Sequence, residues 1–243
     1  MILAVDAGNS RTKWGLFDAA GTLLRHGAVD NHDIARLEQD WRDVPGELRV
    51  TVSNVAGAAV ATRLQAVCDR LALPLRWIVA SSAAGGVRNG YAQPQQLGTD
   101  RWAALVAAWN EYRVPCVVAS AGTALTVDAL SGDGEFLGGL IVPGLSLMRA
   151  ALGGGTAGVG EAAGHWREFP ISTADAVHSG ALAAMGGAVR HMKAMLAARE
   201  GRAPLCLLAG GDAQALADIL DFPVLPVQHL VLRGLFLIES ATP

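Results

Sequence analysis

The chain opens with alternating apolar and polar blocks that predict a β-hairpin. Residues 1–5 form an apolar run of strand length, and Asp6 follows it directly. A polar turn then ends at Lys13, and residues 14–18 read as a returning strand. We therefore expect a hairpin whose tip presents a carboxylate, backbone N–H groups, hydroxyls and a lysine ammonium.

The rest of the first half alternates between strand-like and helix-like patterns. Ile34, Leu37 and Trp41 recur at helical spacing behind a polar cap at residues 31–33, which predicts a helix over residues 31–41. Further predicted segments are strands over residues 27–29, 48–52 and 75–79, helices over residues 60–71 and 102–112, and a loop-rich stretch over residues 80–96. This rhythm after a hairpin indicates a mixed α/β layer fold.

The segment of residues 115–128 repeats the pattern of the first hairpin. It has an apolar run, an Ala-Gly pair, a polar turn and a return strand, with Gly122 opposite Gly8 and Thr126 opposite Thr12. Because the same order of elements restarts after a full domain length, we interpret the chain as a duplication.

The duplication predicts two domains, residues 1–113 and 114–243. Two such domains facing each other would place both turns in one cleft, where each could grip a different part of a triphosphate. The glycine-rich stretch of residues 153–164 is either a lid or a mobile connection. The remaining predicted segments are a glycine-containing stretch over residues 136–143, a strand over residues 205–209, and helices over residues 145–152, 172–198 (with its cap in residues 172–175), 214–220 and 230–238.

Composition and charge narrow the class of protein. Of the 243 residues, 51% are hydrophobic and 17% are charged, so a sizeable core is available. A net charge of −3 and the lack of a long basic cluster argue against a nucleic-acid-binding surface. The start of the chain does not read as a signal peptide, and no apolar run is long enough to cross a membrane, so we expect a cytoplasmic protein.

The cysteines and two of the histidines lack the spacing of a metal site. Cys68, Cys116 and Cys206 are far apart in apolar surroundings, which predicts buried free thiols in a reducing compartment. His178 and His191 fall on a predicted helix without partners at metal-ligand spacing. We expect both to be exposed or hydrogen-bonded.

The polar turn of the first hairpin suits a nucleotide phosphate. N–H groups and hydroxyls can donate to phosphate oxygens, and Lys13 supplies a positive charge. A bare phosphate would repel Asp6, so a magnesium ion or its water should lie between them. The glycine spacing matches neither the Walker pattern nor Gly-x-Gly-x-x-Gly, which excludes a P-loop and a Rossmann fingerprint. An ordinary hairpin with a polar turn is the alternative.

Asp100 and Arg101 stand at the start of the helix predicted over residues 102–112. Helix N-termini favour anions, because their N–H groups and the helix dipole point towards the ligand. The alternative is that Thr99 or Asp100 is an N-cap and Arg101 a surface cation.

Four motifs stand in order along the chain: Asp6-x-Gly8-Asn9-Ser10-x-x-Lys13, Tyr91-x-x-Pro94-x-x-Leu97-Gly98-x-Asp100-Arg101, Gly122-Thr123-Ala124-x-Thr126-x-Asp128 and Gly138-Gly139-x-Ile141-x-Pro143-Gly144. Together they resemble the motifs of the type III pantothenate kinases, within the superfamily of acetate kinase, sugar kinases, Hsp70 and actin. The resemblance covers nearly the whole chain. Thr173 and Gly180 fit a later substrate segment of this family, and Gly210-Gly211 fits the adenosine end.

The resemblance implies two duplicated ribonuclease H-like domains with a nucleotide cleft, and ATP-dependent phosphorylation of pantothenate at the start of coenzyme A biosynthesis. Asp100 would be the general base, and Asp6 would act on Mg²⁺ through water. A cytoplasmic homodimer is implied, with the substrate pocket completed near the subunit interface. The residues implied for ATP are Asp6, Ala7, Gly8, Asn9, Ser10, Arg11, Thr12, Lys13 and Thr123, and those for pantothenate are Tyr91, Gly98, Thr99, Asp100, Arg101 and Thr173.

One position departs from the family pattern. The second phosphate motif often has an acid two residues before its glycine, and that acid helps to bind an activating potassium or ammonium ion. Here the residue is Ser120. Because a hydroxyl is a weaker cation ligand than a carboxylate, we expect monovalent-cation activation to be weakened or to use other oxygens.

Two other functions stay open at this point. The chain could be a kinase for a sugar or another small acceptor, which the motif from Tyr91 to Arg101 disfavours. It could also be a catalytically idle relative that acts as a regulatory accessory protein. The presence of Asp6, Lys13 and Asp100 argues against that, because an idle kinase tends to lose such residues.

Overall fold

The chain folds into two compact units. The first comprises Met1–Tyr112 together with His229–Pro243, and the second comprises Arg113–Gln228. The last segment therefore belongs to the first unit, whereas the sequence analysis placed it in a second domain of residues 114–243. The computed structural model describes residues 1–44, 47–155 and 164–241.

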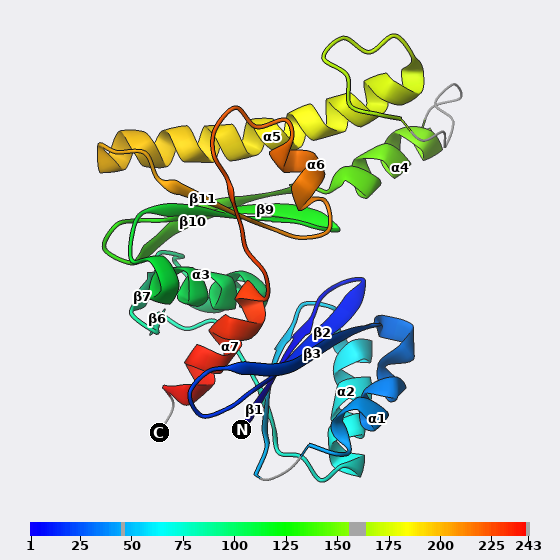
Figure 1. Cartoon of the computed structure of the whole chain (residues 1–243), viewed down its shortest axis with the longest axis vertical. Coiled ribbons are helices and arrows are strands. Elements are labelled where there is room, and N and C mark those ends of the chain that lie inside the picture. The colour runs from blue at the N-terminus through cyan, green and yellow to red at the C-terminus, as the bar shows by residue number, and fades with distance from the viewer. Residues whose placement is uncertain (45–46, 156–163, 242–243) are drawn as a thin grey trace. The chain divides into compact units, whose positions relative to one another are not determined.

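A five-stranded sheet forms the centre of the first unit (Figure 1). β1 is antiparallel to β2 and parallel to β4, and this register places Asp6 opposite Lys13 on one side and Ser53 on the other. Opposed residues point to the same face of a sheet, so these three side chains share one face. In sheet order the strands are β3 (Leu23–Asp30), β2 (Arg11–Phe17), β1 (Ile2–Ala7), β4 (Arg49–Asn54) and β5 (Leu75–Trp77).

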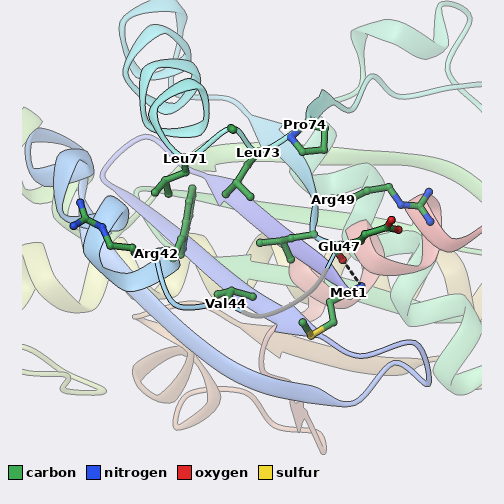
Figure 2. Close-up of a pocket in the computed structure, with 11 residues that line it drawn as sticks. Met1, Arg42, Val44, Glu47, Arg49, Leu71, Leu73 and Pro74 are labelled. Atoms are coloured by element: carbon green, nitrogen blue, oxygen red, sulfur yellow. Dashed lines mark hydrogen bonds between the residues drawn. The ribbon is translucent and has the colours of Figure 1, made fainter.

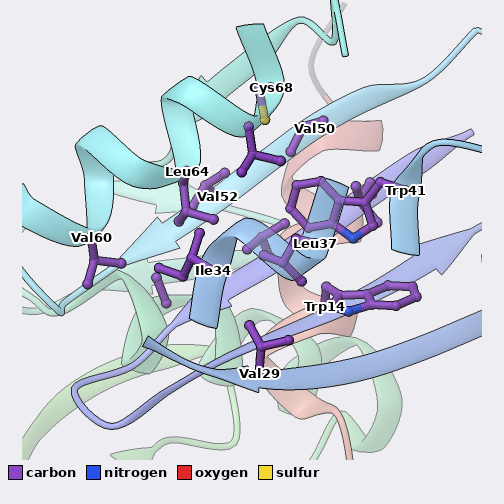
Figure 3. Close-up of a cluster of buried hydrophobic side chains, with 14 of the residues drawn as sticks. Trp14, Val29, Ile34, Leu37, Trp41, Val50, Val52, Val60, Leu64 and Cys68 are labelled. Atoms are coloured by element: carbon purple, nitrogen blue, oxygen red, sulfur yellow. The ribbon is translucent and has the colours of Figure 1, made fainter. Parts of the chain in front are cut away.

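The other face of this sheet carries a large apolar core, shown in Figure 3. Alternate residues of β1 point into it, where they pack with α1 (Leu37–Trp41) and α2 (Ala58–Arg70). The rings of Trp14 and Trp41 meet edge to face, with centroids 6.4 Å apart. Such buried aromatic pairs contribute about 0.5–1.5 kcal/mol beyond the burial of their area.

The segment of residues 31–41 is helical, as predicted, but broken into two short pieces. A 3-10 helix, η1 (Asn31–Arg36), precedes α1, and Asp33 within it has a non-helical conformation. The prediction that residues 31–33 cap this helix is wrong. The Asn31 side chain forms hydrogen bonds to the turn of the first hairpin instead of to the helix.

The loop-rich stretch before α3 contains short regular elements. α3 (Thr99–Tyr112) begins at Thr99 instead of residue 102, so its first turn contains Asp100 and Arg101. The short elements are β6 (Ala83–Ala84), β7 (Val87–Asn89) and the 3-10 turn η2 (Pro94–Gln96).

The C-terminal helix α7 (Leu230–Ser240) packs against α3 and β1 within the first unit. Leu232 and Leu235 join a buried cluster with Ala4 of β1. The buried Glu239 forms an ion pair with Arg76 of β5 at 3.2 Å. These apolar and ionic contacts explain why the tail belongs to this unit.

Five strands of the second unit form a sheet with the same plan. β8 is antiparallel to β9 and parallel to β11, as β1 is to β2 and β4. The repeated strand order and directions confirm the predicted duplication. In sheet order these strands are β10 (Glu135–Pro143), β9 (Ala124–Leu130), β8 (Cys116–Ala121), β11 (Leu205–Ala209) and β12 (Leu225–Pro226).

The two hairpins differ by one residue in the length of their turns. Asp6 opposes Lys13, and Ser120, in the equivalent place, opposes Thr126. Thr126 therefore occupies the position that corresponds to Lys13. The sequence analysis aligned Thr126 with Thr12, and this alignment is wrong by one residue.

The described part of the second unit contains three helices beside its sheet. The cap predicted within residues 172–175 is confirmed and falls on Ser172, whose hydroxyl oxygen accepts the Asp175 N–H at 3.2 Å. α4 extends into the stretch predicted as a lid or connection, of which residues 156–163 lie outside the described residues. The helices are α4 (Leu145–Gly155), α5 (Thr173–Glu200) and α6 (Ala213–Ala217).

The three cysteines are buried and unpaired, as predicted. Burial raises the pKa of the Cys116 thiol to about 12, so this sulfur stays protonated and unreactive. Within the described part of the chain, no helix combines the length and the apolar character that a membrane span requires.

Candidate active site

The turn of the first hairpin is braced by Asn31, which follows β3. Its side-chain amide donates to the carbonyl oxygens of Gly8 at 2.8 Å and Asn9 at 3.1 Å. Its Oδ1 accepts a bond from the Thr12 hydroxyl at 2.9 Å. Sequence reasoning missed this role, because the contact joins segments that are far apart in the chain.

The other residues predicted to bind ATP in this turn fall into two groups. The side chains of Ala7 and Thr12 are buried, so they support the turn from within. Arg11, Lys13 and residues 9–10 are exposed at its surface. Within the exposed group, Arg11 forms an ion pair with Asp30 at 3.2 Å.

Asp6 is the buried carboxylate of the site. Only 8% of the residue is exposed, and its Oδ1 has no hydrogen-bond partner among the described residues. Burial, and then the negative charge of Asp100, raise the pKa of Asp6 to about 7, while Lys13 acts in the opposite direction. An unsatisfied buried carboxylate is costly, and a divalent cation or its water would satisfy it. The buried carboxylate of Asp6 therefore fits a magnesium ion or a water molecule that the ion holds.

Asp100 lies next to a hydrogen bond that joins α3 to β4. The hydroxyl oxygens of Ser53 and Thr99 are 2.7 Å apart, and Ser53 is fully buried. Gly98 precedes the helix at a place where a Cβ would lie 2.7 Å from the Asp100 Oδ1. A larger residue at Gly98 would therefore displace the Asp100 carboxylate.

Arg101 and Tyr91 form the second part of the site. Arg101 is only 6% exposed, and its guanidinium donates to the Tyr91 hydroxyl at 3.2 Å. The interpretation of Arg101 as a surface cation is therefore wrong. Asn89 orders the loop, because its Oδ1 accepts the Tyr91 N–H at 3.1 Å and its amide donates to the Pro94 carbonyl at 3.2 Å.

The second unit contains its own predicted residues around the turn after β8. Ser120 and Thr123 are exposed there. The Gly144 N–H donates to the Thr123 carbonyl at 3.0 Å, and a Cβ on Gly144 would collide with the backbone of the turn. The Asp212 N–H donates to the Ala121 carbonyl at 3.1 Å. The segment that ends at Gly144 and the segment that carries Gly210-Gly211 therefore both contact the turn after β8.

Two further predictions concern α5. Thr173 is its first residue and is exposed. His191 is exposed as predicted. His178 is half-buried, and its Nδ1 has no hydrogen-bond partner among the described residues, so the expected hydrogen bond is missing at this nitrogen. Among the described residues, no three His, Cys, Asp or Glu side chains are grouped to hold a metal.

A hollow of about 660 Å³ opens at the other end of β1 (Figure 2). Met1, Val44 and Leu73 lie around it, and the amino group of Met1 donates to the Glu47 carbonyl at 3.0 Å. The residues predicted for ATP or pantothenate are not among its lining residues. The hollow is therefore separate from the candidate site.

The repeated sheets and the glycine turns define the class as the fold of actin, Hsp70 and sugar kinases. A Campylobacter jejuni structure, provisionally described as a Baf family transcriptional activator, has a TM-score of 0.59 and 20% identity, and covers 99% of this chain and 98% of that one. A Sinorhizobium meliloti structure, provisionally described as a 2-dehydro-3-deoxygalactonokinase, has a TM-score of 0.57 and 14% identity, with coverage of 99% and 98%. At these identities the likeness shows the fold alone.

Sequence comparison identifies the family. The family model of the type III pantothenate kinases matches residues 2–195. A relative from Nitrosospira multiformis, named Type III pantothenate kinase, is 47% identical over 242 residues, which cover 100% of this chain and 92% of the relative. The chain belongs to the type III pantothenate kinase family, as its motifs predicted.

Proposed function

We propose that this chain transfers the terminal phosphoryl group of ATP to pantothenate, giving 4'-phosphopantothenate for coenzyme A biosynthesis, with Asp100 as general base. Family membership supports both substrates. The observation that carries the proposal is the grouping of a buried carboxylate, Asp6, with Asp100 and Lys13 in the first unit. Phosphoryl transfer depends mainly on positioning and charge stabilisation, which such a group supplies.

Asp100 would accept the proton of the attacking hydroxyl. As the oxygen of pantothenate forms its bond to phosphorus, the bond to ADP breaks and ADP leaves with the electron pair. A carboxylate within about 3 Å of the hydroxyl can take the proton that is released. Lys13, on the same face as Asp6, would stabilise the negative charge on the phosphate oxygens.

Arg101 would bind the carboxylate of pantothenate. A guanidinium can form two parallel hydrogen bonds to a carboxylate, which fixes both its position and its orientation. The burial of Arg101 and its bond to Tyr91 restrict the side chain before the substrate arrives. Gly98, Thr99 and Thr173 stay predictions as further pantothenate contacts.

Asp6 would hold the magnesium ion that accompanies ATP, through a water molecule. When bound, such an ion neutralises phosphate charge during transfer. The exposed groups of the first turn and Thr123 would donate to phosphate oxygens. We also propose that Ser120 weakens activation by a monovalent cation, because its exposed hydroxyl stands where an acid is usual.

We further propose that the enzyme is a cytoplasmic homodimer. Phe169 and Ile171, just before α5, are 86% and 97% exposed. Large exposed apolar side chains mark interaction surfaces, and a second copy would cover them. The free buried thiols fit a reducing compartment. Light scattering should give a dimer for the wild type and a shift towards monomer for Ile171→Ser, and a monomeric wild type would contradict the dimer.

An acceptor panel tests the proposed substrate. With ATP and magnesium, phosphate transfer should be fast to pantothenate and slow to pantothenol, which has a hydroxyl in place of the carboxylate. Arg101→Lys should narrow the difference between these acceptors, because a lysine cannot make the bidentate pair. Faster transfer to a sugar than to pantothenate would contradict the proposal.

A further inference from the structure

Ser53 lies beside the candidate site but outside every motif that the sequence suggested. The register of β4 against β1 places it next to Asp6, and the residue is fully buried. Its hydroxyl oxygen lies 2.7 Å from that of Thr99, the first residue of α3. This bond links the strand beside Asp6 to the helix turn that carries Asp100.

We infer that Ser53 is a positioning residue for phosphoryl transfer: its hydroxyl holds Thr99, and with it the first turn of α3, against the end of the sheet that carries Asp6. The inference rests on the proposed role of Asp100 as general base. Ser53 itself need not touch ATP or pantothenate.

The burial of Ser53 makes its bond an effective restraint. Ser53 is fully buried, so water does not compete for its hydroxyl, and removing that hydroxyl would free the half-buried Thr99 side chain from its anchor on β4. Asp100 follows Thr99 directly in the chain, so a shift of Thr99 moves the backbone of the base. A displacement of about 1 Å in a reacting group can cost about a hundredfold in rate.

Thr51 offers a matched control on the same strand. It lies two positions before Ser53, so both side chains point to the same face of β4. It is also fully buried, but its hydroxyl has no hydrogen-bond partner among the described residues. Thr51→Val therefore removes a buried hydroxyl from this face without breaking such a bond.

Steady-state kinetics of Ser53→Ala test the inference. We expect kcat to fall by about tenfold to a hundredfold, with the KM for ATP within about twofold of the wild-type value. Thr51→Val should leave kcat within about twofold. If Ser53→Ala folds poorly by circular dichroism, Ser53→Cys, which keeps the shape of the side chain with a larger atom and weakens the hydrogen bond, should show the same selective loss of kcat.

A double-mutant cycle with Thr99→Val separates positioning from a general structural effect. If Ser53 acts through Thr99, adding Ser53→Ala to Thr99→Val should cost less than about twofold in kcat. Additive losses, or a Ser53→Ala enzyme as active as Thr51→Val, would overturn the inference. In either case an active wild type would leave the proposed function standing, whereas an inactive wild type would overturn both.

Discussion

Replacing Asp6 by asparagine should make the folded protein more stable at alkaline pH, because the substitution removes a buried charge. The pKa of Asp6 rises from 3.8 to about 7 in the fold. Between these values the folded chain keeps a proton that the unfolded chain has lost, so wild-type stability falls as the pH rises through this window. Each pKa unit of difference between the folded and the unfolded chain corresponds to about 1.4 kcal/mol. At pH 8, ionised Asp6 therefore lowers the free energy of unfolding of the wild type by about 4 kcal/mol relative to the protonated side chain.

Urea unfolding without nucleotide or magnesium measures this effect. The advantage of Asp6→Asn over the wild type in free energy of unfolding should grow by about 3 kcal/mol between pH 5 and pH 8. Any fixed cost of burying the amide cancels, because it is the same at both pH values. Thr51→Val is the matched control, because it changes a fully buried polar residue of the same sheet without removing a titratable group, so its effect on the free energy of unfolding should be the same at both pH values. If the advantage of Asp6→Asn in free energy of unfolding were equal at both pH values, Asp6 would not have a raised pKa in the fold.

Three further predictions concern single residues of the site. Asn31→Ala should raise the KM for ATP by about tenfold with little change in the KM for pantothenate, because the phosphate turn loses its brace; equal effects on both constants would contradict this. Gly98→Ala should lower kcat by at least about tenfold, since the new Cβ would displace the Asp100 carboxylate, and wild-type kcat would contradict the geometry. Ser120→Asp should increase the ratio of activity in potassium to that in sodium, and an unchanged ratio would argue against the cation site.

The elements that local sequence patterns specify were predicted well. The first hairpin, α2 and the strands β8 and β9 follow from apolar periodicity and glycine turns, and α5 from its cap at Ser172. The duplication was visible because both halves repeat the same order of such patterns. Aligning the two halves of the sequence without a gap placed Thr126 opposite Thr12 instead of Lys13, because it assumed that both hairpins have turns of equal length.

Contacts between distant segments were not predictable in this way. Asn31 looked like a helix cap, but the carbonyls of the first turn lie within reach of its amide once the sheet forms. The local sequence could not distinguish a binding role for Arg101 from that of a surface cation. Its burial and its hydrogen bond to Tyr91 are properties of the folded chain. Ser53 lacked any local signal, because its partner is on another element. The roles of these polar side chains depend on contacts that only the folded chain brings together.

The most direct test of the proposed function is transfer of phosphate from ATP to pantothenate by the wild type and by Asp100→Asn. We predict rapid transfer by the wild type and a loss of at least about a hundredfold in kcat for the variant, with ATP binding retained. An Asp100→Asn enzyme with near wild-type kcat would contradict the assignment of the base. A folded wild type that binds ATP but does not phosphorylate pantothenate would contradict the proposed function itself.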